Sequence, residues 1–114
     1  TEESDESRMA ELIREAALEG VRDELPHSIA VSIEEILPHE GRDDMVDVHA
    51  TVYVERQSQK SIVLGKGGSR MREVGTTARA GIEKLLGTKV YLDLHVKVLK
   101  EWQRDPKMLG RLGF

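Results

Sequence analysis

The change in the spacing of apolar residues along the chain is the feature that most constrains its fold. Near the N-terminus, apolar residues recur every three or four positions, which is the period of one helix face: Met9, Leu12, Ile13, Ala16, Ala17, Gly20 and Val21. This stripe predicts an amphipathic helix over about residues 7–25, closed by the helix breaker Pro26. Near the C-terminus, apolar residues alternate with other residues, which is the period of a strand: Val90, Leu92, Leu94, Val96 and Val98. A chain that carries both periods is predicted to form an α+β domain.

The segments between these two patterns complete the predicted order of elements. Residues 29–33 and 46–54 alternate in polarity and predict two strands joined by a charged loop. From Ser58 a short, weakly patterned helix then leads to a second helix that Ser69 is expected to N-cap and Gly87 to close. The last residues predict a short helix with Pro106 near its start. The predicted order is α-β-β-α-α-β with a short C-terminal helix.

Length and composition bound the domain organisation. A chain of 114 residues with 39% hydrophobic residues fits one domain, which we expect to span residues 8–114 after a disordered acidic tail or linker over 1–7. Cysteine is absent, so disulfides and cysteine-built metal sites are excluded and a reducing compartment such as the cytosol is expected. No apolar run reaches the roughly 20 residues that span a bilayer. Because the first residue is Thr1 and not Met, we expect a processed chain or an excised domain.

Charge is distributed unevenly along the chain. The net charge is −4, but residues 1–55 carry 4 basic and 16 acidic residues, whereas residues 56–89 carry 8 basic and 2 acidic residues. Local charge decides what a surface attracts, because charges separated by more than a Debye length of roughly 8–10 Å are largely screened. The basic segment is therefore a candidate site for a polyanion.

A glycine-rich loop lies inside the basic segment, in the stretch IVLGKGGSR over residues 62–70. Glycine-rich loops before a helix expose backbone N–H groups to phosphate. The nucleotide-hydrolase motif G-x-x-x-x-G-K-[ST] is absent because Lys66 is followed by glycine, and the dinucleotide motif G-x-G-x-x-G is absent because residue 70 is arginine. A G-x-x-G between two helices remains, which is either the loop that holds single-stranded nucleic acid in KH domains or a tight turn.

The residues around this loop resemble the KH family. The KH pattern aliphatic-Ile-Gly-x-x-Gly-x-x-Ile is matched by VLGKGGSRM over residues 63–71, with two apolar exchanges for isoleucine. The element order resembles the type II, prokaryotic form, which implies a three-stranded mixed sheet with helices on one face. Residues 24–36 and 51–98, Trp102 and the closing LGRLGF further resemble the C-terminal KH domain of the Era family of bacterial GTPases.

This resemblance implies a function at the ribosome. Era-family proteins pair an N-terminal GTPase domain with an RNA-binding domain that takes the 3′ end of small-subunit (16S) rRNA in ribosome biogenesis. The chain is thus expected to bind single-stranded RNA as a monomer, with the small ribosomal subunit and a GTPase domain in cis as partners. GTP and Mg²⁺ are expected in the GTPase domain, and no cofactor or catalysis within this chain. The resemblance also implies a cytoplasmic protein with a peripheral association with the inner membrane.

The resemblance assigns residues that hold the RNA backbone. The clamp is the G-x-x-G loop, whose glycines let phosphates approach and whose lysine supplies a mobile charge: Gly65, Lys66, Gly67 and Gly68. On the following helix, Arg70 and Arg72 are expected to make forked phosphate contacts, with plain solvation as the alternative. Ser69 is expected to cap this helix and can still offer its hydroxyl to a phosphate.

A groove for unpaired bases is expected beside the loop. Its lining is aliphatic, although core packing explains the same residues equally well: Ile62, Val63, Leu64 and Met71. Sequence discrimination is expected from the second strand and the loop over 38–45. The four aromatic residues are too few for a stacking platform, and Trp102 and Phe114 are expected to anchor the terminal helix.

Other sites and functions remain as alternatives. Polar residues share one side of two strands that the fold makes neighbours, and we expect cross-strand pairs there and no metal site: Asp47, His49, Asp93 and His95. No motif positions a nucleophile, so the chain is not expected to be an enzyme. The alternatives to RNA binding are a protein-interaction module that uses the acidic surface of residues 1–55 and a KH domain that binds single-stranded DNA.

Overall fold

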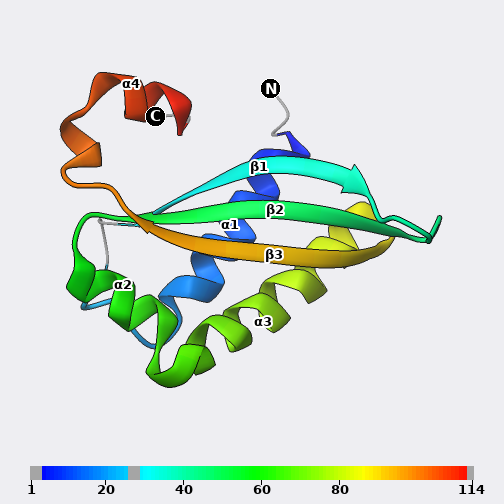
Figure 1. Cartoon of the computed structure of the whole chain (residues 1–114), viewed down its shortest axis with the longest axis horizontal. Coiled ribbons are helices and arrows are strands. Elements are labelled where there is room, and N and C mark those ends of the chain that lie inside the picture. Colours follow the sequence, from blue (N-terminus) through cyan, green and yellow to red (C-terminus); the bar gives the residue numbers. More distant parts are fainter. Residues whose placement is uncertain (1–3, 26–28, 113–114) are drawn as a thin grey trace.

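A three-stranded sheet with two long helices on one face forms the centre of the computed structural model, which describes residues 4–25 and 29–112 (Figure 1). The elements, in chain order, are α1 (Asp5–Leu18), β1 (Ala30–Pro38), β2 (Met45–Val54), α2 (Gln57–Leu64), a 3₁₀ turn (Lys66–Gly68), α3 (Ser69–Leu86), β3 (Lys89–Val98), a second 3₁₀ turn (Trp102–Arg104) and α4 (Pro106–Arg111). This order, α-β-β-α-α-β with a short C-terminal helix, confirms the predicted fold class.

The sheet is mixed, and β2 is its central strand. The strand order is β1-β2-β3, with β1 antiparallel and β3 parallel to β2. Alternate residues of each strand face the helices, as the period of two requires, and the register pairs Val48 with Leu92 on this inner face and His49 with Asp93 on the outer face. Because β3 pairs with β2 alone, its other edge is open towards α3.

The core lies between the inner face of the sheet and helices α1 and α3. Fully buried side chains come from all of these elements, among them Met9, Ile13, Val48, Val52 and Ile82. Burying a side chain of this size contributes about 1.5–3 kcal/mol to stability. The apolar stripes read from the sequence are therefore the faces that hold the layers together.

Helix α1 is shorter at its C-terminal end than its apolar stripe predicted. The helix begins at Asp5, where the Ser4 side chain accepts a hydrogen bond from the backbone N–H of Ser7 at 3.1 Å. Residues 5–7 of the predicted tail thus lie in this helix. The helix ends at Leu18 because Gly20 adopts a left-handed φ of 78°, and turns follow it. Pro26 and residues 1–3 lie outside the described residues.

The C-terminal segment packs on the outer face of the sheet, at the end where β1 begins. Trp102 is 4% exposed and forms a second apolar cluster with Ala30 and Tyr53. Apolar residues of α4 and its flanks pack against this cluster: Leu99, Met108, Leu109 and Leu112. The predicted anchoring role of Trp102 is confirmed, whereas Phe114 lies outside the part of the chain that is described. Across residues 4–25 and 29–112, no helix is long and apolar enough to span a membrane.

Candidate nucleic-acid interface

The glycine loop joins two helices with backbone conformations that favour glycine. Gly65 ends α2 with φ 72°, and Gly67 and Gly68 follow with φ 61° and 76°. Left-handed φ values such as these are strained for residues with a Cβ atom. The backbone conformation of the turn therefore requires the glycines of the G-x-x-G sequence. Residues 65–68 form the connection between the end of α2 and the start of α3.

Glycine is required at position 65 for steric reasons as well as for its backbone conformation. A Cβ atom at this position would lie 2.6 Å from the Cβ and 2.9 Å from the backbone nitrogen of Arg70. The start of α3 is thus packed directly against the end of α2. By contrast, a Cβ on Gly67 meets no atom within 4 Å, so the middle of the loop is open to a ligand.

Lys66 and Ser69 lie at the exposed surface of the loop. Lys66 is in the 3₁₀ turn, and none of the described residues forms a hydrogen bond or ion pair with its side chain. Ser69 is exposed in the first turn of α3, but it is not the N-cap. Gly68 occupies that position, and no side chain caps the helix. The capping role predicted for Ser69 is therefore wrong, because the left-handed glycine takes the cap position and leaves the hydroxyl free.

Arg70 and Arg72 both contact backbone carbonyls near the loop. Arg72 donates a hydrogen bond from Nη1 to the carbonyl oxygen of Gly67 at 2.9 Å, which keeps an exposed guanidinium beside the turn. Arg70 donates from Nη2 to the carbonyl oxygen of Glu19, the residue that follows α1. The other terminal nitrogen of Arg70, Nη1, is buried and has no hydrogen-bond partner. A phosphate contact by Arg70 requires a departure from this arrangement, whereas Arg72 is already at the surface.

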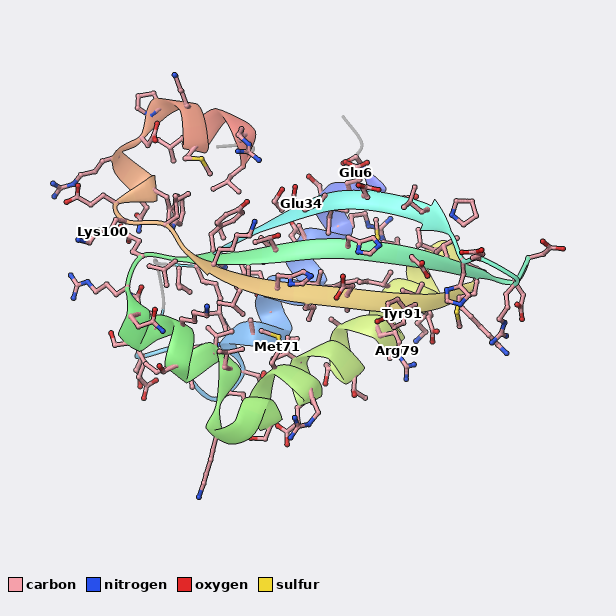
Figure 2. All side chains as sticks on the ribbon, viewed as in Figure 1. Glu6, Glu34, Met71, Arg79, Tyr91 and Lys100 are labelled. Carbon is pink, nitrogen blue, oxygen red and sulfur yellow. The ribbon has the colours of Figure 1, made fainter. Side chains whose placement is uncertain are left out.

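A groove of about 500 Å³ lies between α3 and the open edge of β3. Its apolar lining includes Met71 of α3 and Leu92 and Leu94 of β3, and Arg79 and Asp93 are among its polar residues. Figure 2 shows Met71 and Arg79 on the side of α3 that faces β3. An apolar floor with charged groups beside it suits unpaired bases attached to a phosphate backbone.

The four aliphatic residues predicted to line a groove differ in their exposure and in their location. Met71 lines the groove between α3 and β3. Ile62 and Leu64 are partly exposed next to the loop. Val63 is fully buried in the core, and this corrects the expectation that its side chain lines a groove. The helical period of α2 explains the difference, because residues 62 to 64 point in different directions around the helix axis.

The edge of the groove is β3, and the prediction that the second strand forms it is wrong. β2 is the central strand, so its backbone groups pair with neighbours on both sides. β3 instead presents unpaired N–H and C=O groups along its open edge, where bases can accept or donate hydrogen bonds. Tyr91 lines this groove but was not among the predicted site residues. The available signal in the sequence was an aromatic residue between Val90 and Leu92 of the alternating segment.

One predicted cross-strand pair forms on the outer face of the sheet, between His49 of β2 and Asp93 of β3, and His95 joins it from β3 itself. The Nδ1 atom of His49 lies 2.9 Å and the Nε2 atom of His95 lies 3.1 Å from the same carboxylate oxygen of Asp93. Partial burial acts to raise the pKa of Asp93, but the hydrogen bonds and charges of the two histidines outweigh it and hold the pKa below its usual range. Within residues 4–25 and 29–112, no group of three such side chains is arranged to hold a metal ion.

Comparison with known sequences identifies the fold family. The family model described as KH domain matches residues 24–103. GTPase Era from Mycobacterium sp. (strain KMS) and GTPase Era from Mycobacterium tuberculosis (strain ATCC 25177 / H37Ra) are each 75% identical to the chain over all 114 residues. The chain spans 38% of the length of each of these relatives.

Solved structures agree with the sequence comparison. Era in complex with MgGDPNP and nucleotides 1506–1542 of 16S ribosomal RNA matches 98% of the chain with a TM-score of 0.93 and 38% identity. Era from Aquifex aeolicus bound to GDP·AlF4− matches 99% of the chain with a TM-score of 0.92 and 39% identity. The chain covers 37% and 38% of these two proteins. It therefore belongs to the KH domain family, and along its whole length it resembles the KH domain of the GTPase Era.

Proposed function

We propose that the chain binds single-stranded RNA in the groove between α3 and β3, with the G-x-x-G loop holding the phosphate backbone. The observation that carries this proposal is the position of the exposed, positive-φ loop beside a groove with an apolar floor and an open strand edge. Phosphates approach the loop closely because Gly67 has no side chain, and Lys66 adds a mobile positive charge. Unpaired bases lie on the aliphatic floor and form hydrogen bonds with the edge of β3.

The RNA that we propose is the 3′ end of small-subunit rRNA, in the biogenesis of the small ribosomal subunit. This proposal is supported by the likeness to Era, which was solved together with nucleotides 1506–1542 of 16S ribosomal RNA. We further propose that GTP hydrolysis, with its GTP and Mg²⁺, belongs to the part of Era-like proteins that these 114 residues do not match. In this arrangement the RNA-binding domain expected over residues 8–114 also includes residues 5–7, which belong to α1, and a GTPase domain in cis is its partner.

The test is a fluorescence-anisotropy titration of a labelled RNA that copies the 3′ end of small-subunit rRNA. The variant Lys66→Asp/Gly67→Asp places two carboxylates in the clamp, and the space around Gly67 accommodates a side chain. Aspartate is also among the residues that tolerate a left-handed φ. We expect this variant to bind at least about tenfold more weakly than the wild type at physiological salt, because phosphates are repelled where they must approach.

A matched control carries the same change of charge far from the loop in the sequence. Lys107→Asp/Gly110→Asp alters two exposed positions of α4, and a Cβ on Gly110 meets no atom within 4 Å. This control is expected to bind RNA like the wild type, and thermal unfolding must show that both variants stay folded. Equal binding by the clamp variant and the wild type would reject the clamp, and preferential competition by DNA of the same sequence would favour the single-stranded DNA alternative.

A further inference from the structure

Tyr91 is an exposed aromatic residue at one end of the RNA-binding groove. Its exposed fraction is 52%, the largest among the exposed large hydrophobic residues in the described part of the chain. The other two, Ile36 and Leu37, lie on β1 and are separated from the groove by β2 and β3. Of these three side chains, only that of Tyr91 lies where a ligand in the groove can reach it.

The ring of Tyr91 is in contact with the ring of His39, the residue that follows β1. The His39 ring lies against it at a centroid distance of 6.2 Å and an interplanar angle of 52°. His39 is itself held by Asp47, whose carboxylate lies 2.6 Å from the Nδ1 atom of the imidazole, and Asp47 is the register partner of Tyr91 on β2. The contact with His39 limits the motion of a side chain that is still 52% exposed, so a flat group that stacks on the ring costs little conformational entropy.

Tyr91 is at the end of the groove farthest from the glycine loop. Strand β3 begins beside the end of α3 and runs back along it, which places Leu94 against Gly75 and Tyr91 further towards the C-terminal end of the helix. From Met71 to Arg79, α3 rises by about 12 Å at 1.5 Å per residue. Arg79 is the groove-lining residue of α3 nearest to that end, and Figure 2 shows it on the same side of the molecule as Tyr91.

We propose that Tyr91 and Arg79 form a stacking subsite for one further unpaired base, beyond the four nucleotides that a KH groove holds. The base stacks on the exposed part of the Tyr91 ring, and the guanidinium of Arg79 contacts the adjoining phosphate. Arg79 is exposed, and no residue within 4–25 and 29–112 pairs with it. The proposal rests on the proposed function, since a stacked base must be delivered by RNA that the clamp already holds.

The test measures affinity as a function of RNA length. Labelled RNAs of four to seven nucleotides, copied from the 3′ end of small-subunit rRNA, are titrated into the wild type, Tyr91→Ala and Tyr91→Phe. One stacked base contributes a factor of about five or more to affinity. We expect the wild type to gain this factor when the chain grows beyond four nucleotides, Tyr91→Phe to keep the gain, and Tyr91→Ala to lose it while binding the shortest RNA like the wild type.

A spectroscopic signal and a matched variant complete the design. 2-Aminopurine placed at the added position should be quenched by the wild type and by Tyr91→Phe, and should stay bright with Tyr91→Ala. Leu37→Ala removes another exposed apolar side chain of the outer face and should leave every affinity unchanged.

The outcomes separate this subsite from the clamp. If Tyr91→Ala binds all lengths like the wild type while Lys66→Asp/Gly67→Asp does not bind, the subsite is rejected and the proposed function stands. If Tyr91→Ala lowers the affinity for the shortest RNA as much as the affinity for the longest, the residue belongs to the four-nucleotide groove and the subsite is again rejected. If the wild type binds none of these RNAs, the proposed function fails and the subsite fails with it.

Discussion

Arg70 joins two parts of the fold that lie 51 positions apart in the sequence. Its side chain donates a hydrogen bond to the carbonyl oxygen of Glu19, which is the C-cap of α1, while its Cβ and backbone nitrogen fill the space that the glycine at position 65 leaves open. A guanidinium near the end of a helix also interacts favourably with the negative end of the helix dipole. These contacts assign Arg70 to holding the G-x-x-G loop against α1.

We predict that Arg70→Ala weakens RNA binding severalfold without changing the dependence of affinity on salt. A residue that contacts phosphate contributes about one unit to the slope of log K against log salt, whereas a residue that positions the loop contributes none. Loss of this hydrogen bond should also lower the free energy of unfolding by about 1 kcal/mol. Anisotropy titrations at several salt concentrations and urea unfolding measure the two effects.

Lys66→Ala is the matched comparison for Arg70→Ala. Lys66 is exposed in the loop and is proposed to contact phosphate directly, so its removal should reduce the salt slope by about one unit and leave the free energy of unfolding almost unchanged. A reduced slope for Arg70→Ala would show instead that Arg70 leaves Glu19 and contacts the phosphate backbone, as its position in the sequence first indicated.

At the scale of elements, the parts of the site differ in how far the sequence predicts them. The turn was predictable because only glycine adopts such φ values freely, so three glycines within four residues locate it. The groove edge was not, because the order of strands depends on long-range pairing that alternation in β2 and β3 does not encode. The helical stripe of apolar residues likewise does not show that α1 ends at Leu18, before the stripe itself ends at Val21.

We predict that Trp102→Ala lowers the free energy of unfolding by about 3 kcal/mol. Trp102 is almost completely buried between the outer face of the sheet and α4, and truncation of a buried tryptophan removes a large apolar contact and leaves a cavity. Urea unfolding followed by circular dichroism measures the change. Because the residues of this cluster do not line the groove between α3 and β3, the folded variant should bind RNA within about twofold of the wild type.

Arg104→Ala is the control for the C-terminal segment. Arg104 is exposed in the same 3₁₀ turn, and its ion pair with Glu101 spans 3.8 Å between exposed groups, so its removal should change stability by less than about 1 kcal/mol. A loss for Trp102→Ala no larger than that of this control would mean that the C-terminal segment contributes little to the stability of the domain.

At the scale of the whole molecule, the sheet places one acidic strand, β1, at the edge farthest from the groove. The G-x-x-G loop and α3, which border the groove, belong to the segment with 8 basic and 2 acidic residues, whereas β1 belongs to the acidic segment. β1 and β3 are the opposite edge strands of the sheet (Figure 1), and the groove lies at β3. With neighbouring strands about 4.8 Å apart, β1 is roughly 10 Å from β3, which is about one Debye length at 0.1 M salt.

We therefore predict a specific salt dependence for an acidic chain that binds a polyanion. If the loop and groove neutralise about four phosphates, log K should fall with log salt at a slope of about −3 for single-stranded RNA. Glu34→Gln/Glu35→Gln on β1 should raise affinity at low salt, because two like charges are removed, and should have little effect above about 0.1 M salt, where they are screened. Anisotropy titrations over a series of salt concentrations measure both effects. A slope near zero would mean that phosphates are not the ligand, and would favour a protein partner that docks on the acidic surface of residues 1–55.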